Sequence, residues 1–186
     1  LRELVNIESG SRDKEGLDRI AALIGKRLAA LGARVEYYEP SPAETYRLFD
    51  TPDVVGKVVI GRFKGTGARK IMLLAHMDTV YVHGTLAERP FRVEANRAYG
   101  PGSADDKGGI AVILHTMAIL RALNFREYGT LTVLINGDEE LTRPDSRRVD
   151  HVHIPVRGQG HGQLGSATGQ QVHHTPRQVA RGQHLG

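Results

Sequence analysis

The spacing of apolar residues predicts two long helices separated by apolar strands. Between Asp13 and Leu31 the apolar residues recur at steps of three and four, which gives one apolar stripe along a helix. Gly32 is suited to the end of this helix. Residues 107–123 carry a more apolar version of the same pattern, which predicts a buried helix. A short helix is expected over residues 1–8.

Apolar runs between these helices predict strands. They cover residues 33–38, 54–63, 71–75, 91–94, 97–99 and 130–135. The run 71–75 contains no polar position, which is typical of a strand buried on both faces. Helices that alternate with such strands predict an α/β fold with a mixed, mostly parallel sheet and helices on both faces. A proline-rich loop is expected over residues 40–53.

Side chains that can bind a metal follow the run 71–75. His76 and Asp78 lie two residues apart, so on an extended segment they point the same way. The pair can act as an imidazole ligand and a carboxylate that orients it. An ordinary hydrogen-bonded histidine at a strand end is the alternative.

Two carboxylates lie at the start of the second long helix. Asp105 and Asp106 stand between glycine-containing stretches, which let the backbone turn tightly there. The functional interpretation is a carboxylate that bridges two metal ions. The alternative is an acid favoured by the helix dipole, with Asp106 capping the helix or pairing with Lys107.

An acidic run, Asp138, Glu139 and Glu140, follows the last strand. Three adjacent acids repel one another, so burying them together is costly unless a cation compensates their charge. With a metal bound, one glutamate can be a ligand and its neighbour can take a proton from water. A solvated acidic turn is the alternative. One imidazole and several carboxylates suit zinc, manganese or cobalt.

Composition changes abruptly after Glu140. Residues 1–140 carry equal numbers of basic and acidic residues, whereas residues 141–186 hold the whole net charge of +4 and all of the glutamines. The latter segment has no helix or strand period and too few apolar residues to form a core, so it is predicted to be disordered. It is either an out-of-frame tail or a natural extension. Because the basic excess lies there, no nucleic-acid partner is expected.

Two further classes of structure are not expected. The absence of cysteine excludes disulfides and thiolate ligands. No run approaches the roughly 18 apolar residues of a membrane helix, so no membrane partner is expected. The chain begins at Leu1 inside a helix-like pattern, which leaves the compartment open. The expected compartment is the cytoplasm, or the periplasm or the outside of the cell if an N-terminal signal was lost.

The order of these motifs resembles a superfamily of zinc metallopeptidases that includes glutamate carboxypeptidases, aminoacylases and succinyl-diaminopimelate desuccinylases. The likeness is strongest to the glutamate carboxypeptidase (carboxypeptidase G-like) branch and covers residues 1–140. The segments that carry it are residues 76–81, 90–94, 98–102, 104–109 and 128–133.

The resemblance implies a zinc-exopeptidase-like catalytic domain with two Zn²⁺ ions, for which Co²⁺ or Mn²⁺ can substitute. His76, Asp105 and Glu140 correspond to metal ligands, with Asp105 as the bridging carboxylate. Asp78 corresponds to the residue that orients His76. Glu139 corresponds to the general base, which passes a proton to the leaving amine after a metal-bridging hydroxide attacks the amide. The implied substrate is a peptide or an N-acyl amino acid, with release of C-terminal glutamate.

The sequence also departs from the family pattern. The family has a further acidic ligand, a late histidine ligand and a second domain through which its members often form homodimers, and none is recognisable here. No acid follows Asp150. We therefore expect a catalytic domain that is incomplete at its C-terminus and inactive as it stands. The alternatives are a non-catalytic truncated pseudo-hydrolase and a basic binding protein that acts through its His/Arg tail. The substrate side chain, the physiological metal and the oligomeric state stay open.

Overall fold

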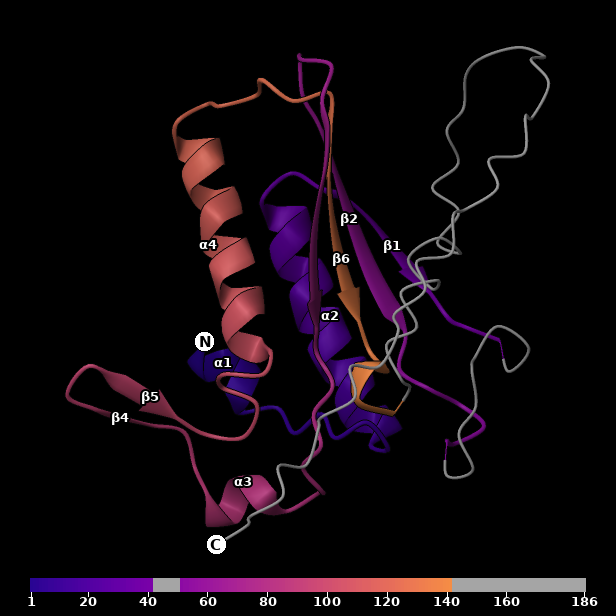
Figure 1. Cartoon of the computed structure of the whole chain (residues 1–186), viewed down its shortest axis with the longest axis vertical. Coiled ribbons are helices and arrows are strands. Elements are labelled where there is room, and N and C mark those ends of the chain that lie inside the picture. The colour runs from indigo at the N-terminus through magenta and orange to yellow at the C-terminus, as the bar shows by residue number, and fades with distance from the viewer. Residues whose placement is uncertain (42–50, 142–186) are drawn as a thin grey trace, which may run out of the picture. The chain divides into compact units, whose positions relative to one another are not determined.

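A computed structural model of the chain describes residues 1–41 and 51–141. Residues 42–50 and 142–186 lie outside the described part (Figure 1). The predicted disorder of residues 141–186, together with the proposal of an out-of-frame tail, therefore falls outside the described residues, except at Leu141. Most of the proline-rich loop predicted over residues 40–53 does so as well.

Helix α2, Lys14–Ala30, confirms the helix predicted from the apolar stripe. It begins because the Asp13 carboxylate accepts a hydrogen bond of 2.8 Å from the amide of Gly16, which has no partner within the helix. It ends where Gly32 adopts a left-handed conformation with φ of +101°. The other helices are α1 (Arg2–Val5), α3 (Thr85–Glu88), α4 (Lys107–Ala122) and a 3₁₀ turn, η1 (Glu139–Leu141).

Four strands form the main sheet in the order β1-β2-β6-β3. Their bounds are β1 Arg34–Tyr38, β2 Val58–Lys64, β3 Lys70–His76 and β6 Thr130–Asn136. A separate two-stranded sheet pairs β4 (Arg92–Glu94) with β5 (Arg97–Tyr99). Strands β3 and β6 are parallel, with His76 opposite Asn136, whereas the β1–β2 and β2–β6 pairs are antiparallel.

The α/β class and the mixed sheet are confirmed, but the prediction of a mostly parallel sheet is wrong for the described strands. Two of the three pairings in the main sheet are antiparallel. The reason is connectivity: in the described ranges, β3 and β6 are the neighbours joined by a helical crossover, through α4, and such a crossover is what parallel neighbours require.

Both long helices cover one face of the sheet. The strand residues that pack with α2 and α4 in the core alternate along each strand and share one face through the register of pairing: Val59, Phe63, Leu73, Ala75, Leu131, Val133 and Ile135. Helix α2 lies close over β2, since a Cβ atom added to Gly61 would lie 3.0 Å from the Leu28 side chain. The predicted helices on both faces are thus not found among the described residues.

Strand β3 corrects a second prediction. The run 71–75 is not buried on both faces, because Ile71 is 40% and Leu74 is 54% exposed. Within the described residues β3 is an edge strand of the sheet, and α4 covers only the face that carries Leu73 and Ala75. An apolar run without polar positions therefore does not prove two-sided burial.

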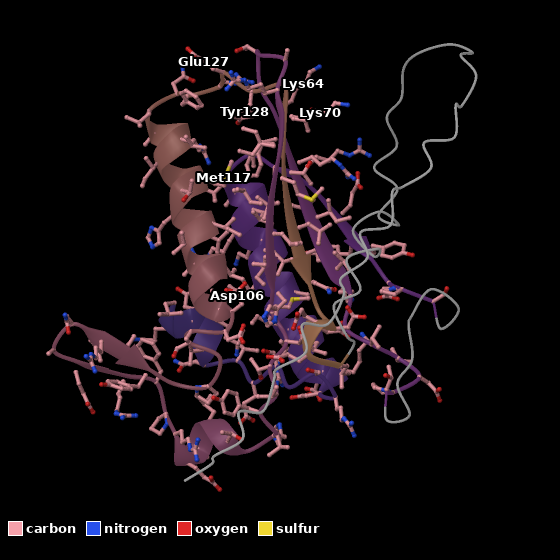
Figure 2. All side chains as sticks on the ribbon, in the orientation of Figure 1. Lys64, Lys70, Asp106, Met117, Glu127 and Tyr128 are labelled. Carbon is pink, nitrogen blue, oxygen red and sulfur yellow. The ribbon has the colours of Figure 1, made fainter. Side chains whose placement is uncertain are left out.

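The topology brings the polar loops to one end of the sheet. Strands β3 and β6 run in parallel and end side by side at His76 and Asn136. Helix α4 starts near the same end, because the amide of His76 donates to the carboxylate of Asp106, the N-cap of α4. Figure 2 labels Asp106 at this end of α4 and Lys64, Lys70 and Tyr128 at the opposite end. None of the helices in the described ranges has the length and hydropathy that crossing a bilayer requires.

Candidate metal centre

His76 lies at the centre of the polar end of the sheet. Its Nε2 atom is 2.8 Å from Oδ1 of Asp105. Its Nδ1 atom is 3.1 Å from the carbonyl oxygen of Asp78 and 3.3 Å from the carboxylate Oδ1 of the same residue. The imidazole is therefore fixed on one side by Asp78 and faces Asp105 on the other.

Asp78 is fully buried and joins three segments of the chain. Its Oδ2 atom accepts hydrogen bonds from the Ser11 hydroxyl at 2.9 Å and from the Glu140 amide at 3.0 Å. Its Oδ1 atom accepts one of 3.1 Å from the Glu139 amide. These donors compensate the buried charge, which would otherwise be costly. Asp78 thus positions both His76 and the turn that carries the two glutamates.

Glu139 and Glu140 reach the same point in space as His76. One potential ligand atom from each of the three residues lies within 4.8 Å of the others. Burial raises the pKa of Glu140, and the negative charge of Asp105 raises it further. A cation would relieve this repulsion, and an imidazole among carboxylates is a donor set that zinc accepts. The residues present therefore fit a divalent metal.

Asp105 and Asp106 have different surroundings. The Asp105 side chain is 77% exposed and contacts His76, whereas Asp106 caps α4 by accepting a hydrogen bond of 3.2 Å from the Gly109 amide. The structure thus brings the five predicted site residues to one end of the sheet: His76, Asp78, Asp105, Glu139 and Glu140. Among the described residues, the mutually close possible ligands are His76, Glu139 and Glu140, and Asp105 is not one of them. The separate roles of these residues stay predictions. Glu139 and Glu140 each have a carboxylate oxygen close enough to His76 to share a metal ion with it.

Comparison with known proteins agrees with this geometry. Residues 72–161 match the family model described as Peptidase family M20/M25/M40. Carboxypeptidase G2 of Pseudomonas sp. (strain RS-16) is 46% identical over 140 residues, which are 75% of this chain and 31% of that protein. The chain therefore resembles part of an M20 family metallopeptidase. Proteins of this family are metal-dependent hydrolases.

A second relative is named for a different activity. Acetylornithine deacetylase of Edwardsiella ictaluri is 29% identical over 146 residues, which are 77% of this chain and 34% of that protein. The chain thus spans about a third of the length of these relatives. A dipeptidase structure from Saccharomyces cerevisiae superposes with a TM-score of 0.62 at 17% identity, over 82% of this chain and 33% of that one, which shows the shared fold.

Two residues of the centre were not found from the sequence. Ser11 contacts Asp78, and Lys107, only 1% exposed, donates a hydrogen bond of 2.7 Å to the carbonyl of Ile7. Burial lowers the pKa of Lys107 to about 8. No spacing signals these contacts, because the partners lie 67 and 100 residues apart in the sequence.

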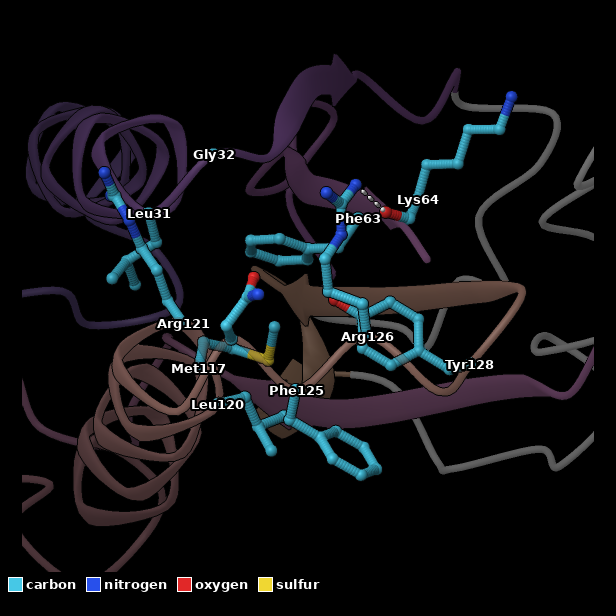
Figure 3. A pocket seen from close by; sticks show the side chains of 11 residues that line it. Leu31, Gly32, Phe63, Lys64, Met117, Leu120, Arg121, Phe125, Arg126 and Tyr128 are labelled. Carbon is cyan, nitrogen blue, oxygen red and sulfur yellow. Dashed lines mark hydrogen bonds between the residues drawn. The ribbon is translucent and has the colours of Figure 1, made fainter. Parts of the chain in front are cut away.

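A cavity of about 240 Å³ lies away from the centre, between the ends of α2 and α4 (Figure 3). Its lining includes Phe63, Met117 and Tyr128, with Arg121 and Arg126 among the polar residues. The two guanidinium groups donate to backbone carbonyls, Arg121 to Ala30 and Arg126 to Lys64. Both arginines are explained by these hydrogen bonds, which pair carbonyl groups at the end of a helix and the end of a strand. We therefore assign the cavity no role in the chemistry.

The protonation of His76 predicts a pH dependence. Burial lowers the pKa of His76, but its hydrogen bonds to Asp78 and Asp105 outweigh burial and the pKa rises from 6.5 to about 9. The protonated ring therefore stabilises the metal-free fold fully below pH 6.5, and this contribution is lost as the pH rises to about 9. Urea unfolding should show stability falling across this window, with a smaller fall in His76→Gln. An equal fall in the variant would contradict the assignment.

Proposed function

We propose that this segment forms the metal-binding part of a carboxypeptidase-like amide hydrolase. His76, Asp105 and Glu140 would hold divalent metal, and Zn²⁺ is the ion that best suits them. The arrangement around Asp78 carries the proposal: one buried carboxylate fixes His76 and also the turn with both glutamates. If Asp78 only formed an ion pair with His76, its hydrogen bonds to the amides of Glu139 and Glu140 would not be needed.

The chain's own residues divide the chemistry among them. A bound metal supplies Lewis acidity, which polarises an amide carbonyl and lowers the pKa of water. Glu139 would take a proton from the attacking water and deliver it to the leaving amine. Asp78 holds Nδ1 of His76, so that Nε2 faces Asp105 and would be the ligand atom when a metal binds. Two ions are part of the proposal, and Asp105 would be one of the residues that hold them.

The proposed substrate is a peptide or N-acyl amino acid from which a C-terminal residue, glutamate in particular, is released. The support is the 46% identity to Carboxypeptidase G2. We also propose that the 186-residue chain alone does not turn over. In the family, further ligands and a dimerisation domain complete the enzyme.

Two measurements test this function. Zinc added to the ¹⁵N-histidine-labelled chain should shift the ring signals of His76, assigned by comparison with His76→Ala, whatever the tail histidines bind. A chimera in which residues 1–140 replace the corresponding part of Carboxypeptidase G2 should hydrolyse acyl-glutamates, whereas the 186-residue chain should stay far below the ~10 s⁻¹ typical of enzymes. Unshifted His76 signals together with an inactive chimera would refute the proposal.

A further inference from the structure

The segment 7–13 contacts two parts of the candidate metal centre, the stretch after β3 and the start of α4. The Ile7 carbonyl accepts a hydrogen bond from the buried ammonium group of Lys107, which follows Asp105 and Asp106 in the sequence. Two backbone hydrogen bonds of 3.0 Å, from Ser11 to Thr79 and from Thr79 to Ser9, join the segment to the stretch after β3. The segment is therefore built into the centre, although none of its residues lies in the metal-binding cluster.

Two buried serines in this segment make similar but distinct hydrogen bonds. The Ser9 hydroxyl donates to the carbonyl of Met77 at 2.7 Å. The Ser11 hydroxyl lies 2.9 Å from Oδ2 of Asp78 and 3.1 Å from the carbonyl of Thr79. A hydroxyl has one proton to donate, and the charged carboxylate is both the nearer and the stronger acceptor. Ser11 therefore bonds Asp78, whereas Ser9 bonds only the backbone.

We propose that Ser11 is a positioning residue for the metal centre and acts through Asp78. This inference rests on the proposed function, because it assigns Ser11 a role in holding the ligands of that site. The Ser11 hydroxyl and the Glu140 amide share Oδ2 of Asp78, while the Glu139 amide and His76 face Oδ1. Removing the Ser11 donor leaves Oδ2 with the Glu140 amide alone, which weakens the hold of the carboxylate on the imidazole and on the glutamate turn.

The expected loss of zinc affinity in Ser11→Ala can be estimated from similar contacts in other metalloproteins. Groups that orient a metal ligand typically change metal affinity by about 10- to 100-fold when they are removed. Asp78 keeps its two amide donors when Ser11 is replaced. We therefore expect the lower end of that range, about tenfold weaker zinc binding, for Ser11→Ala.

The test compares Ser11→Ala with Ser9→Ala in the 186-residue chain. Zinc is titrated against ¹⁵N-histidine-labelled protein and followed at the His76 ring nitrogens, which separates this site from the tail histidines. Ser11→Ala should weaken binding about tenfold, and Ser9→Ala should change it less than twofold. Each variant removes one buried hydroxyl, so similar urea midpoints would show that lost stability does not cause the difference. If Ser11→Ala is too unstable, Ser11→Cys replaces it, because a thiol is a weak donor.

A second readout needs no metal. Amide hydrogen exchange at Glu139 and Glu140 reports how firmly Asp78 holds the turn. Ser11→Ala should accelerate it about fivefold, the scale of one hydrogen bond, and Ser9→Ala should not. Equal zinc affinities and equal exchange in the two variants would overturn the inference and leave the proposed function intact. Absence of zinc at His76 in the unmodified chain would refute the metal site itself, and exchange would then decide alone whether Ser11 positions Asp78.

Discussion

Replacing Glu139 by glutamine should lower turnover by at least about 100-fold without loss of metal, the usual scale for removal of a general base. Glutamine has nearly the same shape but cannot take a proton from water. The experiment uses the chimera with Carboxypeptidase G2, with kcat and metal content measured on the same preparation. The amide of Glu139 bonds Asp78 in either variant, so the turn should keep its position.

Glu140→Gln is the matched control for this prediction. As a proposed ligand, Glu140 should lose metal as well as activity when it is replaced. Both glutamates have a potential ligand atom within 4.8 Å of one on His76, so the two substitutions are compared side by side. If Glu139→Gln lost its metal stoichiometrically while Glu140→Gln kept it, the two assignments would have to be exchanged.

Replacing Asp78 by alanine should destabilise the chain by about 3–5 kcal/mol, the cost of breaking a buried charge network by removing one partner. The change leaves the Ser11 hydroxyl and the amides of Glu139 and Glu140 without their acceptor. Urea unfolding of the metal-free chain at pH 6 measures the effect. Asp78→Asn, which keeps one carbonyl oxygen, should cost less.

Asp18→Ala is a suitable comparison for Asp78→Ala. Asp18 pairs with Lys14 and Lys57, but its side chain is 40% exposed, and such surface pairs contribute at most about 1 kcal/mol. A loss below 1 kcal/mol for Asp78→Ala, or a loss equal to that of Asp18→Ala, would show that the buried carboxylate does not organise the centre.

Local elements of the fold were predictable from the sequence because their causes are local. The strand predicted over 130–135 is β6, Thr130–Asn136, and the apolar stripe of α2 is likewise confirmed. The strand predicted from Val54 instead starts at Val58. Val54 is 62% exposed, and Gly56 packs so closely on Gly137 that an added Cβ would lie 2.1 Å from its carbonyl oxygen. Those contacts join distant residues, so no local pattern reveals them.

The same distinction applies to the candidate centre. His76, Asp105 and the two glutamates follow strands or open a helix, and their chemistry is visible in the sequence. The exposure of Leu74 on β3 depends on which elements cover the sheet, which an apolar run does not encode. The contribution of Ser11 depends on a contact across 67 residues and could be found only in the folded structure.

The long reach of these contacts has a consequence for how the protein folds. The bonds that hold the centre join residues separated by 61, 67 and 100 positions: Glu139 with Asp78, Ser11 with Asp78, and Lys107 with Ile7. Closing such large loops is entropically costly, so contacts of this kind form late and slow the search for the native state. During synthesis Ile7 must wait until Lys107 has left the ribosome, and Asp78 must wait for Glu139. Metal capture would therefore follow the completion of folding and, once achieved, protect the whole assembled domain from reopening.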